Sequence, residues 1–350
     1  MNICFILPKF SRKPIGGFKI VYQYSNILCR MDQHIYIFYM NNNTFAKYRI
    51  PNVVKEIGNE ILTKAEPTWM VLDKKIVKIT PHTKNALDQI KKMDVVICTS
   101  IDTVEMVRDL QTKAKKAYFI QDYENWSKDD SYVQYTYGLG MINIVVSGWL
   151  KNIVDKHSIY PSYLVKNPID INTYRQIVCQ KERTQHTIGL LYHSAEHKGL
   201  KYAFEALRLL KNTYKDLTVK MFGTTKPNQS LPDWIQFTFC ATEKQTVDIY
   251  NSVQVFLCAT VAEGFGLTGL EAMACGAALA STEYDGVKEY AVNEKNALLS
   301  PIKEPAMLAE NVSRLFDDEE LRERIVNNAL EHVKNLSLEK AAGLFLKVLQ

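Results

Sequence analysis

Two successive series of short apolar runs, each alternating with helix-like stretches, constrain the fold of this chain most strongly. In the first series the runs have the length and the β-branched content of buried strands. They cover residues 3–7, 34–39, 95–99, 117–120 and 142–147, and residues 17–30 and 102–111 between them have helical periodicity. Strands that alternate with helices predict a parallel sheet covered by helices.

The same alternation begins again near His186. Apolar runs recur at 187–192, 218–222, 235–239, 253–259 and 277–281, with helical patterns at 200–212, 244–251, 267–275 and 306–315. A chain of 350 residues also exceeds what one hydrophobic core fills. The sequence therefore predicts two doubly wound α/β domains in tandem.

The join between these domains is expected at 166–170, where Pro168 disfavours helix in the residue before it. The predicted domains are residues 1–167 and 168–335. The last amphipathic stretch, 336–350, is expected to form a helix that can pack back toward the N-terminal domain. Residues 47–78 give no clear pattern.

Charge and cysteine content exclude several classes of protein. The net charge is +5, and the excess of Lys and Arg lies in the first half of the chain. This excess fits a solvated surface, or attraction to an anionic acceptor or membrane face. It is too small, without a supporting motif, to predict nucleic-acid binding. The seven cysteines form no CxxC pair, which favours reduced thiols in a cytosolic protein over disulfides or structural zinc.

The apolar runs and the first residues predict neither a membrane-spanning segment nor a secretory signal. No apolar run approaches the roughly 20 residues that span a bilayer. The first residues are apolar and then basic, the reverse of a secretory signal, so residues 3–7 are expected to be a strand. We expect a cytoplasmic protein, with peripheral contact to the inner membrane face through the basic N-terminal domain left open.

A glycine turn between two glutamates is the strongest chemical signal. The run EGFGLTGLE, from Glu263 to Glu271, follows a predicted strand and opens a predicted helix. Gly264 and Gly266 permit a tight turn and close approach to a ligand. The first helix amides and the helix dipole suit a diphosphate, whereas carboxylates accept hydroxyls of a sugar or ribose. The pattern predicts a nucleotide-sugar site.

This run resembles the E-x7-E motif of retaining GT-B glycosyltransferases of the family 4 or group 1 type. Further similar segments are Gly16-Gly17, SGWL at 147–150, VKNPIDINTY at 165–174, YHSAEHKG at 192–199 and GAALASTEYDGVKE at 276–289. The resemblance implies the GT-B fold, with two Rossmann-like domains facing each other across a cleft. It also implies donor binding by Gly16, Gly17, His193, Lys198, Glu263, Gly264, Phe265, Gly266, Leu267, Thr268 and Glu271.

Two positions depart from the family pattern. His193 stands where the family has a phosphate-binding arginine, whereas Lys198 is retained. Gln121 takes the place of a histidine that contacts the donor sugar, within a QDYE run similar to one in some bacterial polysaccharide and rhamnosyl-type transferases. Asp122 or Glu124 in this run could be a general base, or Asp122 could cap the next helix.

The resemblance implies a hexosyltransferase that moves a sugar from a nucleotide-diphosphate donor to a saccharide or lipid-linked acceptor. Glu263, Asp122 and Lys198 are the candidate catalytic residues. The reaction is expected to be retaining and metal-independent, with no cofactor besides the nucleotide sugar as substrate. Inversion, a catalytically silent nucleotide-sugar-binding partner subunit and a nucleotide-sugar epimerase stay open. A pyridine-nucleotide dehydrogenase is disfavoured, because no G-x-G-x-x-G follows a predicted strand.

Overall fold

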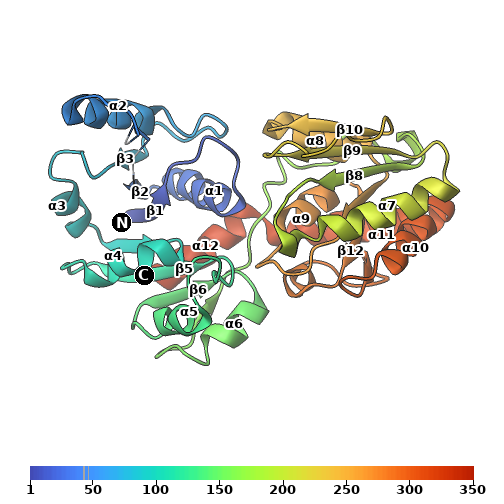
Figure 1. The fold of residues 1–350 in the computed structure, drawn as a ribbon. Coiled ribbons are helices and arrows are strands. Elements are labelled where there is room, and N and C mark those ends of the chain that lie inside the picture. Colours follow the sequence, from blue (N-terminus) through green and yellow to red (C-terminus); the bar gives the residue numbers. More distant parts are fainter. Residues whose placement is uncertain (42–43, 46) are drawn as a thin grey trace. The chain divides into compact units, whose positions relative to one another are not determined.

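The computed structural model describes residues 1–41, 44–45 and 47–350. These residues form two compact units. Unit 1 comprises Met1–Lys166 together with Leu338–Gln350, and unit 2 comprises Asn167–Ser337. Each unit has its own parallel sheet covered by helices (Figure 1).

Unit 1 contains a seven-stranded parallel sheet with the order β3-β2-β1-β4-β5-β6-β7. Central β1 pairs on both sides, so that Cys4 lies opposite Tyr36 of β2 and Val96 of β4. The strands are β1 (Asn2–Lys9), β2 (His34–Asn41), β3 (Val77–Ile79), β4 (Val95–Cys98), β5 (Lys115–Ile120), β6 (Ile142–Val145) and β7 (Tyr163–Leu164). The strand order reverses direction at β1, and loops at such a point commonly bind ligands.

Helices connect these strands, and one more arrives from the end of the chain. They are α1 (Gly16–Arg30), α2 (Asn52–Ala65), α3 (Ala86–Lys91), α4 (Ile101–Asp109), α5 (Asp130–Tyr137), α6 (Gly148–Val154) and α12 (Leu338–Leu349). Phe345 of α12 is fully buried, with its ring 4.6 Å from that of Tyr24 and 5.3 Å from that of Phe119. The last helix is therefore part of the core of unit 1.

Unit 2 has a six-stranded parallel sheet with the order β10-β9-β8-β11-β12-β13. Its strands are β8 (Thr187–Leu191), β9 (Thr218–Gly223), β10 (Ile235–Phe239), β11 (Val255–Cys258), β12 (Ala278–Thr282) and β13 (Leu298–Ser300). Its helices are α7 (Leu200–Thr213), α8 (Glu243–Ser252), α9 (Leu267–Ala274), α10 (Pro305–Asp317) and α11 (Glu319–Val333). Short 3₁₀ turns include η2 (Glu196–Lys198) and η3 (Asp285–Glu289).

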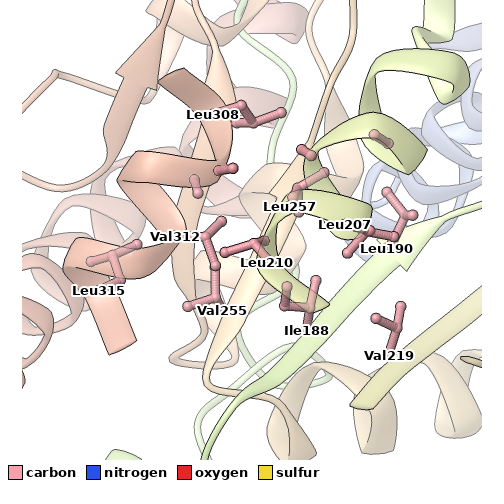
Figure 2. Close-up of a cluster of buried hydrophobic side chains, with 14 of the residues drawn as sticks. Ile188, Leu190, Leu207, Leu210, Val219, Val255, Leu257, Leu308, Val312 and Leu315 are labelled. Atoms are coloured by element: carbon pink, nitrogen blue, oxygen red, sulfur yellow. The ribbon is translucent and has the colours of Figure 1, made fainter. Parts of the chain in front are cut away.

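The core of unit 2 lies between its sheet and helices α7 and α10. Figure 2 shows Leu207 and Leu210 of α7 near Leu308, Val312 and Leu315 of α10. Sheet residues complete the cluster, namely Ile188, Leu190, Val219, Val255 and Leu257. These side chains are at most 3% exposed, so the cluster fixes the helices against the strands whose loops carry the candidate site.

The predicted pair of doubly wound parallel sheets is confirmed. Residues 47–78, which give no clear sequence pattern, form α2 and β3 at one edge of the first sheet. Among the helices of the described residues, none combines the length and apolar content needed to cross a bilayer.

Candidate functional site

The glycine turn joins β11 to α9, and its conformation requires glycine at position 266. Gly266 has φ of +95°, and a Cβ atom there would lie 1.9 Å from the Tyr284 hydroxyl. The Tyr290 hydroxyl donates a hydrogen bond of 2.7 Å to the Gly266 carbonyl oxygen and lies 3.2 Å from the Tyr284 hydroxyl. The buried Tyr284 and Tyr290 therefore pack against the turn and stabilise it. No local sequence pattern identifies them.

Helix α9 begins at Leu267, directly after this turn. Gly266 occupies the N-cap position and has no side chain with which to cap the helix amides. The amides of the first turn have no intrahelical partner and carry the positive end of the helix dipole. The predicted donor residues Leu267 and Thr268 are thus the first two residues of a helix start suited to an anion.

Two loops of unit 2 bring Lys198 and Glu263 together. The amides of Val261 and Ala262 donate to the His197 carbonyl oxygen, at 2.7 and 3.2 Å. Gly199 allows this approach, because a Cβ atom there would lie 1.8 Å from the Ala259 oxygen. These contacts fix the loop after β8 against the loop after β11.

Within these loops the Lys198 ammonium forms an ion pair with the Glu263 carboxylate. The two side chains are 17% and 23% exposed, so the pair is sheltered but can be reached by a ligand. The structure thus places an ammonium group and a carboxylate beside the glycine turn. Phe265, between them and α9, is buried, with its ring 5.5 Å from that of Tyr290.

His193 lies at the start of the loop after β8, and its surroundings favour a neutral imidazole that donates a hydrogen bond. The Ala195 amide donates to its Nδ1 atom at 3.1 Å, so the proton of the neutral ring resides on Nε2. Burial lowers the pKa of His193, and the nearby Lys198 and His197 lower it further. His193 therefore does not carry the fixed positive charge that an arginine at this position would have.

Glu271 lies one turn into α9 and is held by a tyrosine from the neighbouring helix. Its side chain is buried, and its Oε2 atom accepts a hydrogen bond of 3.0 Å from the Tyr250 hydroxyl. Tyr250 is fully buried in α8. The contact orients the carboxylate predicted to bind ribose, and it joins residues that the sequence separates by 21 positions.

In unit 1 the predicted glycine loop is the start of α1. Gly16 and Gly17 are its first two residues. A Cβ atom at Gly17 would lie 3.4 Å from Nε2 of Gln121, which follows β5. The Gln121 Oε1 atom is buried and has no hydrogen-bond partner among the residues that the structure describes. Gly17 and Gln121 therefore share one end of the first sheet.

The two acidic residues after Gln121 differ in role. Asp122 accepts a hydrogen bond from the Tyr123 amide at 2.9 Å, and the next helix, α5, is capped by Asp129 instead. The alternative that Asp122 caps that helix is therefore wrong. Asp122 stays a predicted base, and it belongs to unit 1, whereas Lys198 and Glu263 belong to unit 2.

Glu124 is a structural residue, which corrects the expectation that it could be a general base. It is 4% exposed and accepts a hydrogen bond from the amide of Ile101, the first residue of α4. Burial raises the pKa of Glu124 from 4.5 to about 8. Its carboxyl group thus closes the start of a helix inside unit 1.

Within residues 1–41, 44–45 and 47–350, no group of three or more His, Cys, Asp or Glu side chains is arranged to hold a metal ion. The metal-independent reaction stays a prediction.

Comparison with known proteins finds similarity to glycosyltransferases. Residues 179–332 match the model of the family described as Glycosyl transferases group 1. A Campylobacter jejuni N,N'-diacetylbacillosaminyl-diphospho-undecaprenol alpha-1,3-N-acetylgalactosaminyltransferase is 26% identical over 44% of this chain and 43% of its own length. A Staphylococcus aureus capsular polysaccharide biosynthesis glycosyltransferase is 24% identical over 42% of this chain and 41% of its own. The chain thus spans about two fifths of the length of these relatives.

The solved structure of Anabaena Alr3699/HepE in complex with UDP and glucose superimposes with a TM-score of 0.79 at 13% identity, over 100% of this chain and 99% of that one. The fold is therefore the GT-B fold, as the sequence resemblance implies. The segment that matches the family model, residues 179–332, lies within unit 2 and includes His193, Lys198, Glu263 and Glu271.

Proposed function

We propose that this protein is a glycosyltransferase that moves a sugar from a nucleoside-diphosphate donor to a saccharide or lipid-linked acceptor. The observation that carries the proposal is the Lys198–Glu263 pair beside the start of α9, with the tyrosine-held Glu271 one turn further on. The cation and the helix amides suit the diphosphate of a nucleotide sugar, and the two carboxylates suit the hydroxyls of its sugar and its ribose.

Each part of the site has a role in donor binding. The amides at the start of α9 and the Lys198 ammonium receive the diphosphate. Glu271 accepts hydrogen bonds from the ribose hydroxyls, and Glu263 accepts them from the sugar. His193 donates from Nε2 to a phosphate oxygen. Donor binding then exchanges the Lys198–Glu263 ion pair for two contacts with ligand.

The reaction requires stabilisation of the departing nucleoside diphosphate, whose charge grows as the bond to the anomeric carbon breaks. Lys198 and the first amides of α9 stabilise that charge without a metal ion. The acceptor hydroxyl then attacks from the face of the departing group and passes its proton to the departing phosphate oxygen, which retains the anomeric configuration. An inverting reaction would instead use Asp122 to take the proton of the acceptor hydroxyl.

Two named relatives support a polymer or lipid-linked acceptor for this chain. The Campylobacter jejuni transferase is named for a diphospho-undecaprenol acceptor, and the Staphylococcus aureus protein for capsular polysaccharide biosynthesis. A lipid-linked acceptor would place the reaction at a membrane surface, with peripheral attachment through basic unit 1.

A nucleotide screen tests the donor site. The thermal stability of the purified protein is measured with UDP, GDP, dTDP, ADP and CMP, and the best nucleotide is repeated on Glu271→Ala. One nucleotide should stabilise the native protein by about 2.7 kcal/mol at a hundredfold excess over its dissociation constant. Glu271→Ala should abolish that shift, whereas Glu310→Gln, on the exposed surface of α10, should keep it.

A folded wild-type protein that responds to none of these nucleotides would contradict the donor-site assignment. If a nucleotide binds but no acceptor ever receives sugar from the matching donor, binding without transfer replaces the enzymatic proposal. The screen therefore separates the site from the reaction.

A further inference from the structure

Helix α2 of unit 1 exposes a continuous apolar stripe. Val53, Val54, Ile57 and Ile61 are 65%, 52%, 55% and 62% exposed. Positions 53, 57 and 61 are spaced by four residues and position 54 adjoins them, so all four lie along one side of the helix. We call these four residues the α2 stripe.

The opposite side of α2 is the one that packs on unit 1, and it is polar. The buried residues of α2 are Asn59 and Thr63, and the Thr63 hydroxyl donates to the Asn59 carbonyl oxygen at 2.9 Å. The helix is therefore inverted relative to an ordinary amphipathic helix on a soluble domain. The α2 stripe takes no part in the core of its own unit, and exposed apolar patches of this kind mark interaction surfaces.

The segment just before α2, residues 47–50, is exposed and carries aromatic and basic side chains. Lys47, Tyr48, Arg49 and Ile50 are all exposed, and the Lys47 ammonium lies 5.3 Å from the centre of the Tyr48 ring. No acidic residue occurs between positions 47 and 55. The first acidic residues along the helix are Glu56 and Glu60, and Glu60 is paired with Lys64 at 3.0 Å.

We propose that the α2 stripe and residues 47–50 form a membrane-docking surface that inserts into an anionic lipid bilayer. An interfacial helix buries an apolar face in the boundary between headgroups and acyl chains, and nearby Lys and Arg attract anionic lipid. Tyr48 is a residue type enriched at that depth. This surface would make the membrane contact of the proposed function, and its biological role rests on that function.

Charge favours a bilayer over a second copy of this chain. A two-fold dimer through the α2 stripe would place the same patch on both sides of the interface. Such an interface would gather two copies of the basic segment that contains Lys47 and Arg49, whereas an anionic bilayer is complementary to that segment. A dimer is therefore the competing outcome of the test.

The test is co-sedimentation of the full chain with vesicles, without donor or acceptor. Vesicles of phosphatidylcholine with phosphatidylglycerol are compared with phosphatidylcholine alone. The wild-type protein should partition onto the anionic vesicles, and Ile57→Ser with Ile61→Ser should reduce the partition coefficient by about tenfold or more. Lys47→Gln with Arg49→Gln should reduce it too and should weaken its dependence on salt.

A matched control replaces Ile177 and Val292 of unit 2, which are 63% and 50% exposed, by serine. This variant should bind vesicles like the wild-type protein. Equal binding by the wild-type and Ile57→Ser/Ile61→Ser proteins, or a wild-type dimer in solution that this pair makes monomeric without vesicle binding, would overturn the proposal. Should the serine pair fail to fold, the Lys47 and Arg49 variant decides alone. Nucleotide binding is measured separately, so failure here leaves the donor site standing.

Discussion

The hydrogen bond from Tyr250 to Glu271 gives a residue-scale prediction about donor affinity. Tyr250→Phe keeps the ring, which packs 5.1 Å from that of Phe256, but removes the donor that orients the carboxylate. Loss of a hydrogen bond to a charged group should weaken nucleoside-diphosphate binding by about tenfold. Isothermal titration calorimetry measures the change.

Tyr214→Phe is the matched control for that substitution. The Tyr214 hydroxyl also donates to a carboxylate, that of Asp317, at 2.9 Å, but this pair packs against the core of unit 2 beside α10. Tyr214→Phe should lower the free energy of unfolding without changing nucleotide affinity. Equal losses of affinity in both variants would mean that Tyr250 acts through general stability.

Glu124 gives a second residue-scale prediction, about pH. The native pKa of about 8 lies above the ordinary value of 4.5, so the folded protein holds a proton that the unfolded chain releases between these values. Stability from this group is present at low pH and is lost as pH rises toward 8. Glu124→Gln cannot ionise, and its amide oxygen can still accept from the Ile101 amide.

The measured quantity is the difference in the free energy of unfolding of unit 1 between Glu124→Gln and wild type. That difference should move in favour of the variant by roughly 3–4 kcal/mol from pH 5 to pH 8. Urea unfolding at both values checks it. A difference independent of pH would mean that Glu124 is ionised throughout this range.

At the scale of elements, two glycines in helical surroundings should respond oppositely to alanine. Gly266→Ala puts a Cβ atom on a residue with φ of +95° and against Tyr284, so unit 2 should lose about 2–4 kcal/mol and its nucleotide binding. Gly343 is exposed inside α12, and a Cβ atom there would meet nothing within 4 Å. Gly343→Ala should stabilise unit 1 by about 0.5–1 kcal/mol, because alanine is the better helix former. Thermal unfolding and nucleotide titration of both variants decide, and tolerance of alanine at Gly266 would contradict the strained turn.

The sequence predicts elements well where local pattern and burial agree. Predicted strand 3–7 lies within β1, and predicted helix 267–275 matches α9 to within one residue. The sequence gives no prediction for α2, whose apolar residues face solvent and whose buried ones are polar. Periodicity alone assigns a side to each residue but does not say which side packs against the protein.

The candidate site divides in the same way. Glu263, Lys198 and the glycine turn are predictable because motif and loop position occur within short stretches of sequence. Tyr250, Tyr284 and Tyr290 are not, because their contacts with Glu271 and Gly266 arise only when separate elements pack. The burial of Glu124 under the start of α4 is equally a product of tertiary packing.

For the whole molecule, the assignment of α12 to unit 1 means that the chain passes between the units twice, near residues 166–167 and 337–338. The fold of unit 1 is therefore complete only when α12 has packed against it. Phe345 of α12 lies among Phe5, Tyr24 and Phe119, which come from β1, α1 and β5. The stability of unit 1 should depend on this last helix, whereas the stability of unit 2 should not.

Phe345→Ala tests this dependence. Removing a fully buried phenylalanine should destabilise unit 1 by about 3–5 kcal/mol, through lost burial and the cavity left behind. Leu344→Ala, on the neighbouring position that is 54% exposed, should cost less than about 1 kcal/mol. Hydrogen exchange read by mass spectrometry should show faster exchange in β1, α1 and β5 of Phe345→Ala and unchanged protection in β8, β11 and α7. Uniform loss of protection across both units would mean instead that they unfold together, and nucleotide binding by Phe345→Ala would then fall with its stability.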